Sequence, residues 1–177
     1  MNDLNALKEI AVEAIRRAFP VGDAPPDALM RNDHCSECQE TVDRFVGKRW
    51  PEIGVCDLAG NPGPSLLTAV GFRYYLPVMM LRAMEAPREL DCFPDSVIGE
   101  LSPAGSKLNT HSGNRLNDFT ADQVHAILAF LRFFESSEKV AAAKDDWPKE
   151  AIATIPISRP LSRALKYWQA RLLAMST

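Results

Sequence analysis

Residues Leu66–Met84 carry the sequence LLTAVGFRYYLPVMMLRAM, and this stretch predicts a buried helix. Thr68 supplies an oxygen for an N-cap. Apolar residues then cover nearly the whole circumference, which is typical of a helix packed on more than one side. Pro77 has no N–H for the carbonyl of Arg73, so we expect a kink in the middle of the helix. The stretch therefore predicts a central, proline-kinked helix, but it indicates no substrate.

Further helices are expected on both sides of this stretch. Over residues 4–19, apolar side chains recur every three or four residues, and Asp3 can cap the start. Thr120 and Gln123 have the spacing of a capping box and precede an apolar run that ends at Phe134. The remaining expected elements are helices that begin at Ser36, near Asp95 and near Pro160, and a single turn at Asp27–Met30.

The segments between the expected helices are polar or rich in Pro and Gly. We expect Trp50–Pro64 to be irregular and Ala104–Asn117 to be a mobile loop. Ile152–Ile157 is the only stretch that favours a strand, and Pro156 limits it to an edge. The sequence therefore predicts an all-α fold, a single compact multi-helix domain over residues 1–177. We expect five to seven helices, two of them central, joined by long irregular connections.

Composition and charge narrow the classes of function. The chain of 177 residues is 46% hydrophobic and 24% charged, which is ordinary for a globular protein with one core. Its net charge of −3 argues against nucleic acid as a partner, because neutralising phosphates requires a concentrated basic face. The first residues lack a signal-peptide pattern, and no apolar run approaches the roughly 20 residues of a membrane span. We therefore expect a soluble cytoplasmic protein.

The basic residues are spread along the chain, and their nearest approach to a cluster lies on the last expected helix. Arg159, Arg163, Lys166 and Arg171 have helical spacing there. We interpret them as the solvated side of an amphipathic helix, and contact with an anionic partner is the alternative.

The segment His34-Cys35-Ser36-Glu37-Cys38 raises the question of a metal site. A C-x-x-C pair supplies two zinc thiolates, but a structural zinc site needs two further ligands. Cys56, Cys92 and His111 are single residues at irregular spacing, so the motif is only half present. A redox pair would follow a strand, and no strand is expected before Cys35. We interpret the cysteines as structural, expect no metal and no cofactor, and keep zinc binding as the alternative.

The sequence contains no recognised catalytic motif. G-x-S-x-G, the P-loop, G-x-G-x-x-G and H-E-x-x-H do not occur. His111 lies in a polar segment near Asp118, but a triad is recognised by its geometry, which this segment does not specify. His125 lies beside the apolar stripe of its helix and is interpreted as exposed or half-packed. We therefore expect no catalytic residues and no enzyme activity.

Four aromatic and basic residues form the predicted binding site: Trp50, Arg73, Tyr74 and Tyr75. Residues of these types often anchor recognition surfaces. Tyr74 and Tyr75 point about 100° apart on a helix, so at least one hydroxyl should reach the edge of the core. The alternative is that both tyrosines fill the core and that Arg73 pairs with a nearby acid.

These residues also lie in motifs that resemble a bacterial family of unknown function. The shared patterns are a Gly-basic-x-Trp segment, a Leu-Thr-x-x-x-Phe-Arg-Tyr-Tyr-Leu-Pro helix, and a Phe-Thr-x-x-Gln helix that ends in Phe-Leu. They stand at Gly47–Trp50, Leu67–Pro77 and Phe119–Leu131, so the resemblance covers residues 34 to 134. Ala69-Val70-Gly71 replaces the Pro-Glu of the family pattern, which leaves the helix start without a carboxylate. The resemblance implies no activity, cofactor or catalytic residue.

The sequence favours a small cytoplasmic interaction protein without catalysis, of adaptor or immunity type. Its expected partner is another protein, and neither nucleic acid nor a membrane is expected to bind. The alternative is a zinc-supported structural module built on His34, Cys35 and Cys38.

Overall fold

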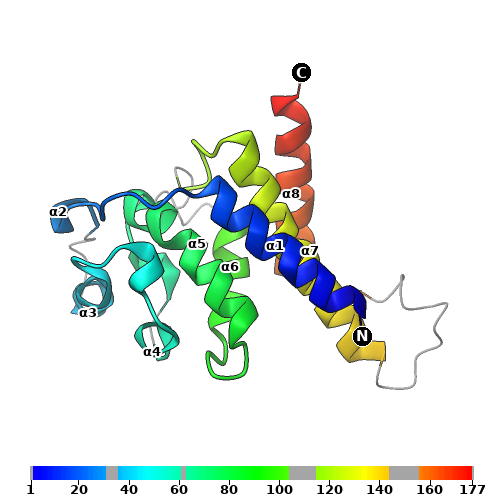
Figure 1. Ribbon diagram of the computed structural model, residues 1–177, viewed down its shortest axis with the longest axis horizontal. Coiled ribbons are helices and arrows are strands. Elements are labelled where there is room, and N and C mark those ends of the chain that lie inside the picture. Colours follow the sequence, from blue (N-terminus) through cyan, green and yellow to red (C-terminus); the bar gives the residue numbers. More distant parts are fainter. Residues whose placement is uncertain (1, 31–35, 61–62, 104–114, 144–155, 177) are drawn as a thin grey trace. The chain divides into compact units, whose positions relative to one another are not determined.

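The computed structural model describes residues 2–30, 36–60, 63–103, 115–143 and 156–176 (Figure 1). Over these residues it contains eight α-helices, two short 3-10 helices and no strand, which confirms the all-α prediction. The count exceeds the expected five to seven because α2 and α4 are single turns of helix. The α-helices are α1 (Asn2–Ala18), α2 (Asp27–Met30), α3 (Ser36–Phe45), α4 (Val55–Leu58), α5 (Ala69–Glu85), α6 (Phe93–Leu101), α7 (Ala121–Ala143) and α8 (Arg159–Met175), and the 3-10 helices are η1 (Trp50–Glu52) and η2 (Pro64–Leu66).

Contacts divide the chain into two compact units. Unit 1 comprises Met1–Ala18 and Thr120–Thr177, and unit 2 comprises Phe19–Phe119. In the sequence, unit 2 is therefore inserted between α1 and α7. The expectation that residues 1–177 form a single domain stays a prediction.

Unit 1 is built around α7, which contacts both α1 and α8. Figure 1 shows α1, in blue, lying along α7, in yellow. On α8 the side chains of Leu161, Leu165 and Trp168 are buried, and that of Met175 near its end is 43% exposed. At the start of α7 the Thr120 N–H donates to Gln123 Oε1 at 3.1 Å, and the Gln123 N–H donates to Thr120 Oγ1 at 3.3 Å. This reciprocal pair confirms the predicted capping box.

Unit 2 is built around α5, which contacts α2, η1 and α6. Ten of its 17 residues are buried, and they lie on all sides of the helix, as the apolar circumference predicts. The helix continues without interruption through Pro77. The kink at this proline stays a prediction.

Thr68 begins α5 and ties it to α2. Its Oγ1 accepts the N–H of Gly71 at 3.2 Å, which confirms the predicted N-cap. The same hydroxyl donates to the carbonyl of Leu29 at 2.6 Å, and the Thr68 N–H donates to Met30 at 3.3 Å. The cap therefore fixes both the start of α5 and the position of α2.

The expectation that Trp50–Pro64 is irregular is wrong for residues 50–52 and 55–58. The segment contains η1 and α4, and Ile53 and Leu58 are fully buried. Asp57 stabilises α4 by accepting the N–H of Gly54 at 2.8 Å, a local bond that compensates for the high Pro and Gly content.

Arg115 is the buried centre of the polar contacts in unit 2. Its side chain is 4% exposed and pairs with Glu100 of α6 at 2.9 Å. The guanidinium also donates to the carbonyls of Ser65 and Leu67, and it lies 5.7 Å from the ring centre of Phe72. Arg115 falls within the segment that the sequence assigned to a mobile loop. That prediction is wrong for this residue, and residues 104–114 lie outside the described part of the chain.

Unit 2 begins and ends with phenylalanines that contact each other. The rings of Phe19 and Phe119 lie 6.4 Å apart in an edge-to-face arrangement, and both side chains are buried. The two points where the chain enters and leaves unit 2 are therefore neighbours.

Replacing Thr68 with Val should lower the free energy of unfolding by about 1–2 kcal/mol, because it removes the cap oxygen and the donor to Leu29. Thr68→Ser retains the hydroxyl, so its free energy of unfolding should fall much less. Urea unfolding of both variants checks this, and equal losses would contradict the assigned cap.

Replacing Arg115 with Met should lower the free energy of unfolding by about 3 kcal/mol or more. It leaves the carboxylate of Glu100 and the carbonyls of Ser65 and Leu67 without their donor. The exposed Arg88→Met variant is the matched control and should unfold like the wild type. Urea unfolding measures both, and a loss below 1 kcal/mol in Arg115→Met would refute the central role of this contact.

Candidate functional site

The four residues of the predicted binding site divide into two groups. Trp50 is 6% exposed and Tyr75 is fully buried, whereas Arg73 and Tyr74 are half-buried. All four lie in unit 2, at η1 and on α5. The structure therefore leaves two of them, Arg73 and Tyr74, accessible to a partner.

Tyr75 joins α5 to the segment that follows α3. Its hydroxyl lies 2.8 Å from the carbonyl oxygens of both Phe45 and Lys48 and donates to them. Its ring packs on the Phe45 ring with centres 4.6 Å apart. Burial raises the pKa of Tyr75 far above its usual value, because the phenolate would be poorly solvated there. The hydroxyl thus serves as a structural donor. Tyr75 fills the core, which agrees with the alternative that the tyrosines are core residues.

Tyr74 lies at the edge of the core. Its hydroxyl donates to the carbonyl of Gly22 at 2.7 Å, and its ring meets the Tyr75 ring edge-on at 4.8 Å. Burial raises the pKa of Tyr74, although the backbone N–H of Trp50 acts in the opposite direction. Tyr74 therefore presents one side of an aromatic ring whose orientation is fixed by the Gly22 contact.

Arg73 pairs with an acid from a distant segment. Its Nη1 lies 2.7 Å from Asp118 Oδ2 and donates to the carbonyl of Asn117 at 3.3 Å. The Arg73 side chain is 28% exposed and that of Asp118 is 77% exposed. Asp118 has φ = 63°, a left-handed conformation that Asp adopts more readily than most residues. The expected alternative, an Arg73–acid pair, is confirmed.

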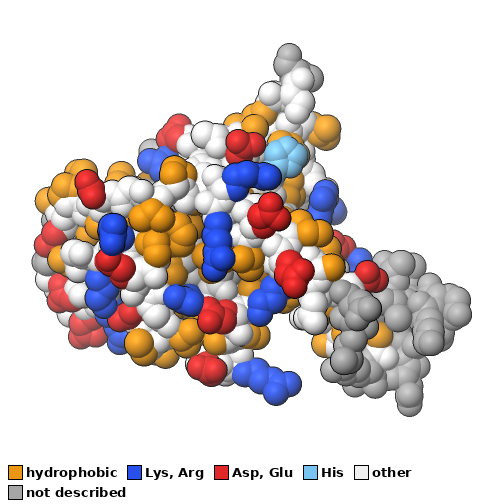
Figure 2. Space-filling view, in the orientation of Figure 1, with side chains coloured by type: hydrophobic (Ala, Val, Ile, Leu, Met, Phe, Trp, Pro, Cys, Tyr) orange, Lys and Arg blue, Asp and Glu red, His pale blue; other side chains and the backbone are white. Residues whose placement is uncertain are grey.

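These residues define an exposed patch, here named the α5 face: Val21, Val70, Arg73, Tyr74 and Asp118. Val70 precedes Arg73 and Tyr74 by three and four residues, so the three share one side of α5. Val70 is 38% exposed, and Val21, which neighbours the Gly22 contact of Tyr74, is 52% exposed. Figure 2 shows one side of the molecule, on which acidic, basic and hydrophobic side chains alternate in small groups. The α5 face combines two exposed valines with an aromatic ring and an ion pair.

Sequence reasoning missed three contributors to this patch: Val21, Gly22 and Asp118. They lie 45 to 53 residues from their partners on α5, and nothing in their local pattern marks them as neighbours. Trp50 is largely buried, and its indole Nε1 has no acceptor among the described residues. Its role in binding a partner stays a prediction.

The structure tests the cysteine predictions only in part. Cys38 is 3% exposed and lies on the same buried edge of α3 as Val42 and Phe45, as expected for a structural thiol. His34, Cys35 and His111 lie outside the described residues. Over the ranges that the structure describes, no three His, Cys, Asp or Glu side chains are grouped as metal ligands. Zinc binding by the His34–Cys38 segment stays untested.

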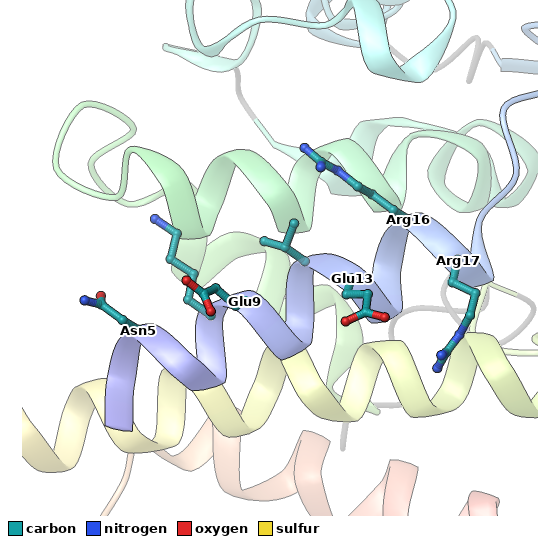
Figure 3. A pocket seen from close by; sticks show the side chains of 7 residues that line it. Asn5, Glu9, Glu13, Arg16 and Arg17 are labelled. Carbon is teal, nitrogen blue, oxygen red and sulfur yellow. The ribbon is translucent and has the colours of Figure 1, made fainter. Parts of the chain in front are cut away.

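A hollow of about 710 Å³ lies along α1 (Figure 3). Among the side chains labelled there, the acidic Glu9 and Glu13 are followed along the helix by the basic Arg16 and Arg17. All seven lining residues belong to α1, so they form a row along one helix. Such a row does not bring a nucleophile and a base together at one point, and we do not place a catalytic site there.

No helix in the described ranges is both long and apolar enough to cross a bilayer.

Replacing Tyr75 with Phe should lower the free energy of unfolding by about 1–3 kcal/mol near neutral pH, because the Lys48 carbonyl loses its donor and the Phe45 carbonyl keeps only the N–H of Lys48. Tyr74→Phe is the matched control. Its free energy of unfolding should fall less, since the Gly22 carbonyl lies near solvent and can accept a hydrogen bond from water instead. Urea unfolding of both variants checks the order, and a larger loss in Tyr74→Phe would contradict it.

The Tyr75 contact should also make stability depend on pH. Its folded pKa is raised above the unfolded value of about 10, so the stabilisation is complete below that pH. Above it the unfolded chain loses the proton first, and the stabilisation falls as the pH rises. Measured by urea unfolding between pH 7 and about 11, the wild type should therefore lose more stability than Tyr75→Phe.

Comparison with known proteins identifies a family but no characterised relative. No protein with curated annotation and no solved structure matches the sequence. A family model described as a family of unknown function, DUF6714, matches residues 29–172, from α2 into α8. Because this match covers most of the chain, the protein belongs to the DUF6714 family of unknown function.

Proposed function

We propose that this chain is a small cytoplasmic interaction protein, of adaptor or immunity type, that binds another protein through the α5 face. One observation carries the proposal. Val70, Arg73 and Tyr74 stand on the same side of α5 and are accessible in part, and residues far away in the sequence hold Arg73 and Tyr74 in place. Arg and Tyr are the side chains that most often dominate protein–protein binding.

The fixed geometry of the α5 face favours binding. Ordering a flexible side chain in an interface costs about 0.5–1.5 kcal/mol. Contacts with Asp118 and Asn117 already order Arg73, and the contact with Gly22 orders Tyr74. Binding a partner therefore requires little further ordering of these two side chains. The exposed valines add apolar surface next to these polar groups, which is the composition typical of a recognition patch.

The same contacts argue against catalysis at this face. The Arg73 guanidinium is neutralised by Asp118, and the Tyr74 hydroxyl donates to a carbonyl while its pKa is raised. A phenol in this state is a poor nucleophile and a poor base. The polar groups of the α5 face are therefore suited to orienting a partner.

We expect that Val70→Asp abolishes the binding of a protein partner, because it buries an unpaired carboxylate in the centre of the interface. Val70 is exposed in the second position of α5, where an acidic residue is compatible with the helix dipole, so folding should be unaffected. Tagged wild type and variant are compared by quantitative mass spectrometry of proteins retained from native lysate.

Val140→Asp is the matched control, because it makes the same substitution at a 44% exposed valine on α7. A protein retained by the wild type and by Val140→Asp but lost from Val70→Asp supports the proposal. Arg73→Ala combined with Tyr74→Ala should lose the same protein. Identical retained proteins for all variants would refute a role of the α5 face.

A further inference from the structure

The outer side of α8 carries a straight row of three cations. Arg159, Arg163 and Lys166 are exposed and follow each other at steps of four and three residues. At 100° and about 1.5 Å per residue, they lie within roughly 60° of arc and span about 10 Å along the helix. Leu173, seven residues beyond Lys166, continues the row and is 72% exposed. These four residues are here named the α8 stripe.

The α8 stripe lies opposite the side of α8 that packs in unit 1. Leu161, Leu165 and Trp168 are buried and lie on the reverse side of the helix. Arg171 is separate from the stripe, because its guanidinium lies 5.6 Å from the Trp168 ring centre and donates to the Tyr167 hydroxyl at 3.2 Å. The structure thus divides the four basic residues of the helix into one that packs and three that face outward.

Within the part of the chain that the structure describes, the three outward cations have no carboxylate partner. The sequence of α8 contains no Asp or Glu, and within the described chain none of the three forms an ion pair. Glu138 of α7 approaches the start of α8, but its carboxylate accepts the N–H and the hydroxyl of Ser158 at 2.8 and 2.9 Å. In a protein of net charge −3, a positive row of this length without a carboxylate partner among the described residues is a local exception.

We propose that the α8 stripe binds an acidic helix of another protein. A helix with carboxylates at matching steps of four and three residues places three charges opposite Arg159, Arg163 and Lys166, and a further apolar residue covers Leu173. An anionic membrane is a poorer fit, because Leu161, Leu165 and Trp168 of α8 are buried and cannot insert. Nucleic acid is also a poorer fit, because three charges neutralise few phosphates.

The probe is a labelled, alanine-based helical peptide with three glutamates spaced four and three residues apart and a leucine seven residues beyond the last. Fluorescence anisotropy measures its binding to the whole protein at low salt. We expect saturable binding that weakens as salt rises, and at least about tenfold weaker binding by Arg159→Gln/Arg163→Gln/Lys166→Gln. Leu173→Ala should weaken binding by about fivefold, an effect that attraction between charges alone would not produce.

The matched control is Arg17→Gln/Arg88→Gln/Arg132→Gln, which removes the same charge from three exposed, scattered arginines. It should bind like the wild type, and a peptide with glutamines in place of glutamates should not bind. The proposal is overturned if the glutamate peptide fails to bind, if the control variant loses as much affinity as the stripe variant, or if anionic vesicles or duplex DNA bind more tightly than the peptide. Because the stripe lies in unit 1 and the α5 face in unit 2, either proposal can fail without the other.

Discussion

Unit 2 contains backbone carbonyls that accept no hydrogen bond within a regular helix. Its fold depends on side chains that donate hydrogen bonds to them. The 3-10 helix η2 and Leu67 precede α5; the carbonyl of Leu67 is buried and that of Ser65 is part-buried. Arg115 provides donors to both and pairs with Glu100, while its planar group stacks on Phe72. A buried cation is costly unless it is paired and hydrogen-bonded; both Nη atoms of Arg115 are used in this way, whereas its buried Nε has no partner among the described residues. The contact therefore demands a single arrangement of the segments around it.

The same principle recurs along α5. Tyr75 donates to the carbonyls of Phe45 and Lys48, and Arg82 Nε donates to that of Ile53 at 3.1 Å. Short helices and turns surround α5, and their ends would otherwise leave buried carbonyls unpaired. The central helix thus contributes polar contacts as well as apolar surface. This explains why aromatic and basic residues concentrate on it and why some of them are buried.

Local features of the fold could be predicted from the sequence, whereas long-range polar pairs could not. Thr68 and the Thr120–Gln123 pair act within one turn of helix, so their spacing alone indicates the caps. Arg115 contacts residues 48 to 51 positions away, and its polar sequence surroundings resemble a loop. The burial of Trp50 and Tyr75 could not be predicted for the same reason. Residue type suggested recognition, while burial was decided by partners that no periodicity reveals.

The insertion of unit 2 between α1 and α7 has a consequence for synthesis on the ribosome. The helix α1 packs on α7, which is translated about 100 residues later. Translation proceeds at roughly 5–20 residues per second, so about 5–20 s pass between the synthesis of α1 and that of α7. During this time the apolar side of α1 lacks its partner helix. Residues 19–119 are translated within that interval, and the contact between Phe19 and Phe119 brings the two ends of this stretch together. Folding of the inserted unit thus brings the nascent α7 close to α1. The pairing of α1 with α7 then requires the closure of only a short loop.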